Sequence, residues 1–205
     1  MSKSVRSRSS SKKAPVKAES PLRADAQRNA EALVEAAKKV FAKLGCDAPV
    51  REIADAAGVG VGTVYRRYPK RSDLIAAVFR REVDACATAA TTLAEQHSPG
   101  EAVRRWVDRF VDFINTKRGL ASALHSGDPA YTPLRAYFDE NLVPALDDLL
   151  KAAVEAGEIE ASVEARELIM AVASLCTPRA ELSADYPRRM IGLLLDGLRC
   201  RGDRT

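Results

Sequence analysis

The sequence predicts an all-α protein in which a three-helix N-terminal head precedes a larger helical body. Apolar residues recur at helical spacing from about residue 25 onward, and no stretch of useful length alternates apolar and polar residues as a strand does. Alanine and leucine dominate, whereas aromatic residues make up only 5% of the chain. These two residue types lose little side-chain freedom in a helix, and 205 residues can bury a sizeable core.

Charge divides the chain into two unlike parts. Residues 1–83 contain 18 Lys and Arg against 9 Asp and Glu, whereas residues 84–205 contain 14 against 19. A basic head on an acidic body is typical of a protein that meets a polyanion with one end only. We therefore expect a DNA-binding domain over 24–83 and a regulatory and dimerisation domain over 84–205.

Residues 1–23 are rich in Ser, Lys and Arg and nearly free of large apolar groups. Such a segment cannot bury enough surface to offset its ordering entropy, so we expect a disordered basic tail. The tail is either an arm that seeks phosphates or a solubilising segment without a specific contact. Its basic residues up to position 17 are Lys3, Arg6, Arg8, Lys12, Lys13 and Lys17.

The head is expected to contain three helices. The first begins near Asp25 and ends at Gly45, because glycine adopts the left-handed conformation after a last helical turn. Two short helices follow over 50–57 and 62–68. Pro69 ends the second of them, because the residue before a proline is disfavoured in a helix.

The two short helices satisfy the spacing of a helix-turn-helix motif over 49–68. Such a motif needs a small residue where the helices cross, a glycine in the turn and an apolar residue that packs back onto the first helix. Ala54, Gly58 and Val64 meet these three needs. An ordinary helical hairpin with a solvated basic face would not need tyrosines and a threonine interleaved with its arginines.

The second helix of the motif is expected to lie in the major groove of DNA. Its hydroxyls can bond phosphates, the cations after it can neutralise the backbone, and either Arg66 or Arg67 can bond a guanine edge. The predicted DNA-binding residues are Thr63, Tyr65, Arg66, Arg67, Tyr68, Lys70 and Arg71.

The stretch from Val50 to Leu74 resembles the DNA-binding head of TetR-family regulators; it runs VREIADAAGVGVGTVYRRYPKRSDL. Phe41 and Gly45 match that family's first helix and its end. The resemblance covers residues 25–83. It implies an all-helical homodimer, usually a repressor, that leaves its operator when a small molecule enters the C-terminal domain.

The resemblance also implies roles for single residues. Thr63, Tyr65 and Arg71 match positions that usually touch phosphates. Pro49 stands where the family often has a Thr or Ser that caps the second helix, so Asp47 is the alternative cap.

The body is expected to contain helices capped by Ser72 and over 100–116, 133–155, 163–176 and 187–199, with a short helix between residues 115 and 133. The resemblance, which is weaker here and carried by the Ala156–Ile159 connector, implies a ligand pocket among the middle helices. Its expected lining is Trp106, Phe110, Phe113, His125, Tyr137 and Phe138. For each of these residues the alternative is plain core packing. Arg105 and Arg109 either meet an anionic ligand or form a solvated face.

The last two helices are apolar on more than one stripe, since Leu193 and Leu195 add to the set that contains Ile191 and Leu194. A helix with such a surface needs a second partner. The resemblance makes that partner the same helix pair of another subunit, which would form a four-helix bundle. A two-fold dimer would present two heads to a near-palindromic site.

Other classes of protein are disfavoured. The four cysteines lie far apart without a CxxC spacing, so we expect no metal, no disulfide framework and no cofactor, and we interpret the cysteines as small buried hydrophobes. No phosphate loop, GxSxG or HExxH motif is present, which argues against an enzyme. No secretory signal or membrane-spanning stretch is recognised, so we expect a cytoplasmic protein.

These observations predict a sequence-specific transcriptional regulator that binds double-stranded operator DNA. The leading hypothesis is a homodimeric repressor released by an unknown small-molecule effector. The alternative is a regulator without a small-molecule pocket, switched by a protein partner or acting as an activator.

Overall fold

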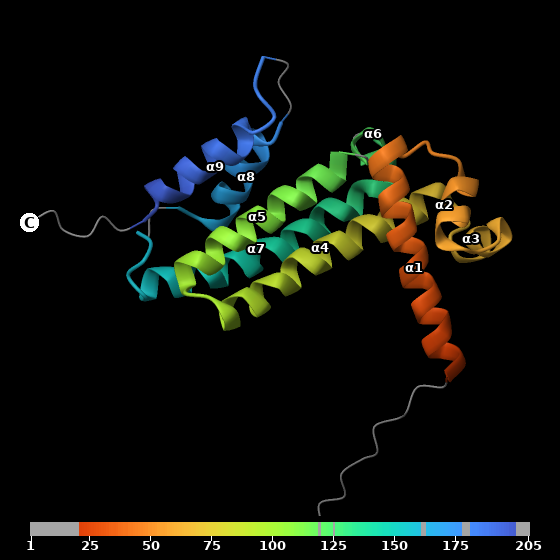
Figure 1. Cartoon of the computed structure of the whole chain (residues 1–205), viewed down its shortest axis with the longest axis horizontal. Coiled ribbons are helices and arrows are strands. Elements are labelled where there is room, and N and C mark those ends of the chain that lie inside the picture. Colours follow the sequence, from red (N-terminus) through yellow and green to blue (C-terminus); the bar gives the residue numbers. More distant parts are fainter. Residues whose placement is uncertain (1–20, 119, 125, 161–162, 178–180, 200–205) are drawn as a thin grey trace, which may run out of the picture.

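The computed structural model describes residues 21–118, 120–124, 126–160, 163–177 and 181–199 (Figure 1). Over these residues the chain is helical, and the isolated bridge between Ile159 and Arg199 is its sole β-pairing. In chain order the elements are α1 (Pro21–Leu44), α2 (Val50–Ala57), α3 (Val61–Arg67), α4 (Arg71–Gln96), α5 (Pro99–Arg118), α6 (Ala121–Leu124), the 3-10 turn η1 (Pro129–Tyr131), α7 (Thr132–Glu155), α8 (Ala165–Leu175) and α9 (Tyr186–Gly197). The predicted all-α class is confirmed.

Two predicted boundaries of the head differ from the structure. Helix α1 begins at Pro21 rather than near Asp25, so residues 21–23, predicted as tail, belong to that helix. Residues 1–20, with the rest of the predicted basic tail, lie outside the described residues. Helix α4 runs without a break through the predicted domain boundary at residue 83 and therefore connects head and body rigidly.

The predicted helix caps were wrong at two places. Helix α4 begins at Arg71, one residue before Ser72, and the Asp73 carboxylate accepts the Lys70 backbone N–H at 3.0 Å. Acidic groups are favoured in this first turn because they meet the positive end of the helix dipole. Helix α2 follows Pro49 without any side-chain cap, and the Glu52 N–H instead donates to the Pro49 carbonyl at 3.0 Å.

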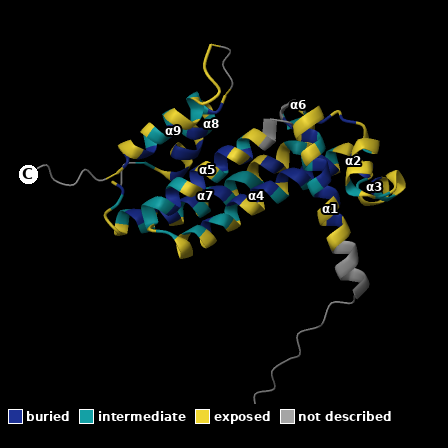
Figure 2. Ribbon diagram, viewed as in Figure 1, coloured by how far each residue is buried: buried dark blue, intermediate teal, exposed yellow. Residues whose placement is uncertain are grey.

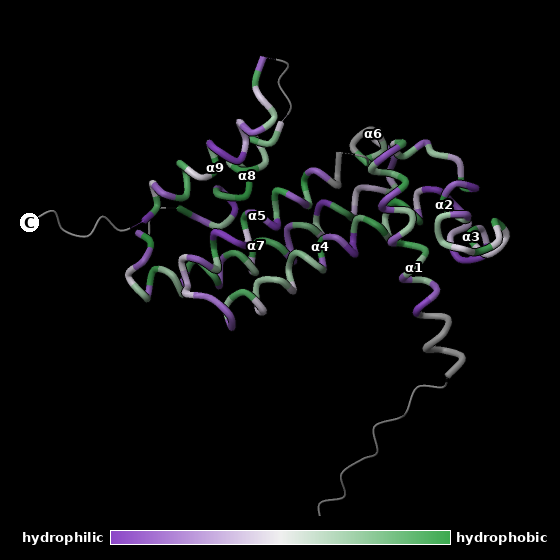
Figure 3. Tube along the Cα trace, in the orientation of Figure 1, coloured by the Kyte–Doolittle hydropathy of each residue, from purple (hydrophilic) through white to green (hydrophobic). Residues whose placement is uncertain are grey.

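The body is built around α4, α5 and α7, which lie side by side as a long bundle, with α8 and α9 covering one side (Figure 1). Their facing sides are buried and apolar, whereas their outer sides are polar (Figures 2 and 3). Trp106, Phe110 and Phe113 of α5 stack at centroid distances of 5.6 and 5.9 Å, and the Trp106 ring N–H donates to the Cys86 carbonyl at 3.0 Å. This aromatic stack is the centre of the body's core.

The predicted role of the cysteines as small buried hydrophobes fits the structure. Cys46, Cys86 and Cys176 are buried within the hydrophobic core, and Cys200 lies outside the described residues. Burial, opposed by Arg109, raises the pKa of Cys86 to about 12. Its thiol therefore stays protonated at neutral pH and unreactive. The described residues contain no cluster of His, Cys, Asp and Glu that could hold a metal ion.

One ion-pair cluster joins the head to the body. Glu82 of α4 is a buried charged residue whose side chain is only 5% exposed. Lys38 of α1 approaches its Oε1 at 2.9 Å, and Arg109 of α5 approaches its Oε2 at 3.9 Å. Among the described residues, that Oε2 atom receives no hydrogen bond. The cluster of Lys38, Glu82 and Arg109 thus holds three helices together at the base of the head.

Candidate DNA-binding surface and effector groove

Helices α2 and α3 form the predicted helix-turn-helix at one end of the molecule (Figure 1). Ala54 is fully buried where the helices cross, and Val64 of α3 is 1% exposed against α1 and α2. Gly58 ends α2 with φ +66°, and the Val59 N–H after it donates to the Ala54 carbonyl at 3.0 Å. Because this φ is strained for other residues, the predicted turn glycine is required.

Helix α3 is largely exposed in Figure 2, and three of the predicted contact residues on it, Tyr65, Arg66 and Arg67, are exposed. Tyr65 is 53% exposed, Arg66 is exposed, and Thr63 is half-buried. The Arg66 guanidinium lies 3.5 Å from the Thr63 hydroxyl oxygen, one helical turn away. Thr63 and Arg66 therefore share one face of α3, and that face is open to solvent.

The next two residues turn toward the rest of the head. Arg67 is exposed, but together with the half-buried Tyr68 it lines a hollow of about 440 Å³ between α1 and α4. Arg80 and Asp84 of α4 line the same hollow. The two arginines that the sequence left equivalent as base readers thus lie on different sides of α3.

Lys70 and Arg71 follow α3 and differ in what they contact. Lys70 is exposed. Arg71 is exposed as a residue, yet its Nη1 donates to the Cys46 and Ala48 carbonyls at 2.6 and 2.7 Å. Arg71 therefore pins the loop between α1 and α2. This structural role was not visible in the sequence because the two carbonyls lie 25 and 23 positions away.

The body contains a half-open groove of about 310 Å³ between α4, α7 and α8. Its apolar walls come from Phe79, Phe138, Ile169 and neighbouring side chains, and Tyr131 of η1 forms part of the wall nearest the head. The complete lining is Phe79, Leu124, Tyr131, Leu134, Arg135, Phe138, Asp139, Arg166, Ile169, Met170 and Ala173. Its volume lies at the lower end of the range of about 300–1,000 Å³ that is usual for ligand pockets.

Few of the residues predicted to line a ligand pocket line this groove. Phe138 lines the groove, whereas Trp106, Phe110 and Phe113 are at most 1% exposed and do not line it. The core-packing alternative therefore fits these three rings, because α4 and α7 cover both sides of their helix.

Tyr137, also predicted to line the pocket, lies outside the groove as well. The Tyr137 hydroxyl donates to Asp84, and its ring lies under Arg80 at 5.8 Å, on the side of α7 that faces α4. The hydrogen bond to Asp84, with burial adding to it, raises the pKa of Tyr137. His125 lies outside the described residues. Arg105 pairs with Glu101 at 2.7 Å on the surface, so it belongs to a solvated face.

Sequence reasoning missed the polar residues of the groove. Arg135 and Asp139 of α7 stand one turn apart, and Arg166 of α8 pairs with Asp139 at 3.2 Å. The i, i+4 spacing from Arg135 to Asp139 was available in the sequence. It could not be distinguished from an exposed helix face until α8 was placed beside it.

Tyr131 links the groove to the head. Burial and the neighbouring Asp128 raise the pKa of Tyr131, Cys46 adds to this effect, and the positive charge of Arg71 opposes it. Both Cys46 and Arg71 belong to the contact that pins the loop between α1 and α2. Tyr131 therefore lies close to the contact that pins the base of the head.

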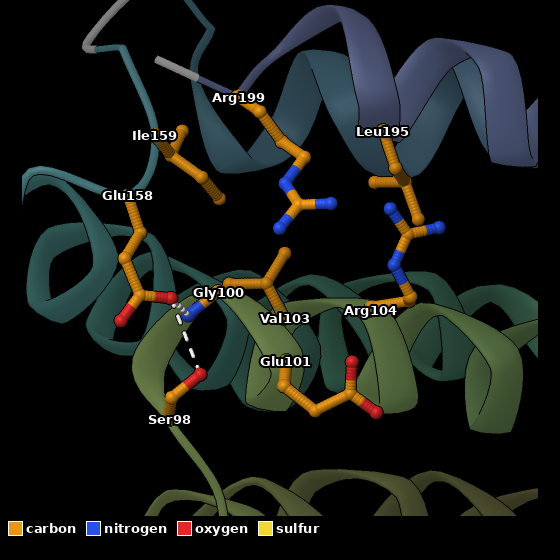
Figure 4. Close-up of a pocket in the computed structure, with 9 residues that line it drawn as sticks. All are labelled: Ser98, Gly100, Glu101, Val103, Arg104, Glu158, Ile159, Leu195 and Arg199. Atoms are coloured by element: carbon orange, nitrogen blue, oxygen red, sulfur yellow. Dashed lines mark hydrogen bonds between the residues drawn. The ribbon is translucent and has the colours of Figure 1, made fainter. Parts of the chain in front are cut away.

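A smaller cavity of about 170 Å³ lies at the opposite end of the body, between the start of α5, the α7–α8 connector and α9 (Figure 4). Its Glu158 carboxylate accepts the Gly100 backbone N–H at 2.9 Å and the Ser98 hydroxyl at 3.2 Å. A Cβ at position 100 would lie 2.6 Å from that carboxylate oxygen. Glu158 therefore caps the N-terminus of α5.

Substituting Glu158 with alanine is expected to lower the free energy of unfolding by about 1 kcal/mol, because the N-terminus of α5 loses its anionic cap. Urea denaturation of the wild type and variant at one protein concentration measures the change. Glu158→Gln, which keeps an acceptor but removes the charge, is expected to fall between them. An alanine variant as stable as the wild type would contradict the capping role.

Comparison with known proteins agrees with the fold. The family model for bacterial regulatory proteins of the tetR family matches residues 33–78, and a model for the C-terminal domain of SbtR-like transcriptional regulators matches residues 98–200. The second match alone covers half of the chain. Together the two matches include α2, α3 and all of the groove lining except Phe79.

Solved structures extend the likeness over most of the chain. A TetR transcriptional regulator from Streptomyces coelicolor is 35% identical, with 84% of this chain and 99% of that chain covered at a TM-score of 0.70. A TetR regulatory protein from Mycobacterium vanbaalenii is 34% identical, with coverages of 87% and 99% and the same TM-score. LfrR from Mycobacterium smegmatis, solved in complex with proflavine, is 25% identical, with coverages of 88% and 99% and a TM-score of 0.59.

No helix in the described part of the chain is both long and apolar enough to cross a membrane. The helix-turn-helix geometry, the two family matches and the structural likeness agree with one another. The chain therefore belongs to the TetR family of bacterial DNA-binding transcriptional regulators.

Proposed function

We propose that this regulator is a homodimeric repressor that holds operator DNA through α3 and is released when a small molecule occupies the groove between α4, α7 and α8. The single observation that carries the proposal is the position of the groove. Its wall includes Phe79 of α4, which continues into the head, and Tyr131, which lies within electrostatic reach of Arg71. A ligand that binds the two states of the dimer unequally can then shift the heads.

The related LfrR supports the presence of an effector, since it was solved with proflavine bound. The groove of the present chain has a pocket-like volume and apolar walls, as an effector site requires. The effector therefore acts from the body, at a distance from the DNA-binding surface of the head.

The placement of the two arginines favours Arg66 as the base reader. Arg66 shares the open face of α3 with Thr63, whereas Arg67 lines the hollow toward α1 and α4. In this proposal Thr63, Tyr65 and Lys70 bond phosphates, and Arg67, Tyr68 and Arg71 support the surface at its margin. A bidentate contact from Arg66 to guanine contributes about 1–3 kcal/mol of discrimination.

The homodimer is proposed to form through α8 and α9. Both helices expose a large apolar side chain, Met170 at 60% and Leu193 at 62%. The opposite sides of the same helices are buried, for example at Val172 and Ile191. An exposed apolar side chain on the outer side of each helix is consistent with a helix-bundle interface between subunits.

Lys70→Ala is expected to weaken operator binding by a similar factor for all DNA sequences, because a phosphate contact carries no base information. The slope of the logarithm of the binding constant against the logarithm of the salt concentration is expected to become shallower by about one per subunit.

Arg66→Ala is instead expected to relax the base preference at one position of each half-site, with Arg67→Ala as its matched control. Fluorescence anisotropy on operator variants at several salt concentrations measures both effects. Equal sequence preference for the Arg66 variant and the wild type would refute the assignment of the base reader.

The proposed function is tested by sequencing the genomic fragments that the purified protein retains, followed by a reporter placed behind the retained site. Deleting the regulator is expected to raise reporter expression, and small molecules that displace the operator should bind the dimer. Lower expression after deletion would identify an activator. An operator complex that responds to a bound protein and to no small molecule would favour the alternative of a protein-switched regulator.

A further inference from the structure

We propose that the groove between α4, α7 and α8 selects small apolar molecules that carry one anionic group. The inference deepens the proposed function, on which it rests only for what ligand binding does to the operator. The chemical class of the ligand follows from the side chains of the groove itself.

The walls of the groove exclude a strongly polar ligand. Phe79, Leu134 and Ile169 are nearly fully buried behind it, and Phe138 and Tyr131 add partly buried rings to the wall. Phe138 in turn packs on Phe110 and Phe113 at 6.0 and 5.9 Å. The wall thus rests on the rigid aromatic stack of the core and offers a preformed surface to an apolar or aromatic ligand body.

The charged residues of the groove favour an anion. Two arginines, Arg135 and Arg166, line the groove together with one acidic residue, Asp139. Asp139 pairs with Arg166 at 3.2 Å. Within the part of the chain that the structure describes, no carboxylate lies within salt-bridge distance of Arg135. The groove therefore has one positive charge, that of Arg135, which no carboxylate of the groove neutralises.

An anionic headgroup would neutralise this excess positive charge, because guanidinium groups bind carboxylates, sulfonates and phosphates through charge-assisted hydrogen bonds. Arg135 stands on the same helix as Phe138 and is one turn before Asp139, so its charge lies at the edge of the aromatic wall. A ligand can then place its apolar body on the wall and its headgroup on Arg135. Asp139 and the ligand headgroup compete for the guanidinium of Arg166. Asp139 therefore weakens anion binding.

The test uses three probes that share one apolar body and differ in headgroup: phenylbutyrate, phenylbutanol and phenylbutylamine. Isothermal titration calorimetry on the full-length protein measures their affinities. Phenylbutyrate is expected to bind about ten-fold more tightly than the alcohol, and the amine more weakly than both. Equal affinities for acid and alcohol, preference for the amine, or binding of none of the three would overturn the proposal.

Two substitutions are expected to change the affinity for phenylbutyrate in opposite directions. Loss of folding would lower the affinity in both variants, so this pair distinguishes the two causes. Arg135→Met keeps the length of the side chain and is expected to weaken phenylbutyrate about ten-fold, with the alcohol changed by less than about three-fold. Asp139→Asn is expected to strengthen phenylbutyrate, because Arg166 is released from its pair. Arg105→Met, on an exposed arginine of α5 away from the groove, is the matched control and should change neither affinity. An unchanged preference in the Arg135 variant would refute the assignment.

Operator binding measured with the same proteins separates this inference from the proposed function. If phenylbutyrate binds through Arg135 but leaves the operator complex intact at saturation, the ligand class stands and the release mechanism fails. If other molecules displace the operator while the acid shows no preference over the alcohol, the release mechanism stands and the ligand class fails.

Discussion

Phe110→Ala is expected to lower the free energy of unfolding by about 4 kcal/mol, because it opens a cavity in a region that cannot collapse around it. The ring is 1% exposed and stacks between Trp106 and Phe113, with Phe138 at 6.0 Å. Replacing a large apolar residue in such a position by alanine removes both the free energy of its transfer from water and its packing contacts. Urea denaturation followed by far-ultraviolet circular dichroism measures the change, at one subunit concentration because dimerisation contributes to stability.

The matched control for Phe110 is Phe138→Ala. Phe138 is only partly buried and lines the groove, so its loss is expected to cost less stability and to weaken binding of apolar ligands directly. The comparison separates a core ring from a ligand wall. A Phe110 variant that remains as stable as the wild type would show that the aromatic stripe of α5 is not close-packed and would restore it as a candidate ligand contact.

Lys38→Met is expected to lower the free energy of unfolding by about 3 kcal/mol, because it leaves the buried Glu82 carboxylate without its close partner. Lys38 lies 2.9 Å from Glu82 Oε1, whereas Arg109 lies 3.9 Å from Oε2, too far for a hydrogen bond. A buried, uncompensated charge costs far more than the ion pair itself contributes. The variant is also expected to loosen α1 against α4 and so weaken operator binding.

The two residues of this ion pair are expected to differ in how much stability their substitution costs. Glu82→Leu should cost less than Lys38→Met, because the Lys38 side chain is 27% exposed and its ammonium can turn to water. The double variant Lys38→Met, Glu82→Leu is expected to recover most of the stability lost in Lys38→Met. Urea denaturation of the three variants tests the cycle. Additive losses would mean that Lys38 and Glu82 are not energetically coupled.

The helix-turn-helix was predictable because its requirements are local. A small residue at Ala54, a glycine at Gly58 and an apolar residue at Val64 act on one another within eleven positions, and the structure has all three in the expected states. The bounds of α2 agreed with the prediction as well. Helix ends were less predictable: Ser72 and Asp73 are both good first-turn residues, and one residue of register decides which of them bonds the backbone.

The groove between α4, α7 and α8 was hardly predictable because its members come from distant elements. The periodicity of Trp106, Phe110 and Phe113 shows that one face of α5 is buried, but it cannot show whether a ligand or another helix covers that face. In the structure α4 and α7 cover it. The groove lies one layer further out, where Arg135 and Asp139 of α7 meet Arg166 of α8.

The sequence by itself therefore determined the all-helical class, the position of the head and the surface of α3, since periodicity and short spacings encode these features. Tertiary structure alone decided that Arg71 binds loop carbonyls, that Arg66 and Arg67 lie on different sides, and which cavity remains beside the aromatic core. The physical reason is the same in each case. A side chain's partner depends on how helices pack, and packing joins residues whose separation along the chain carries no local signal.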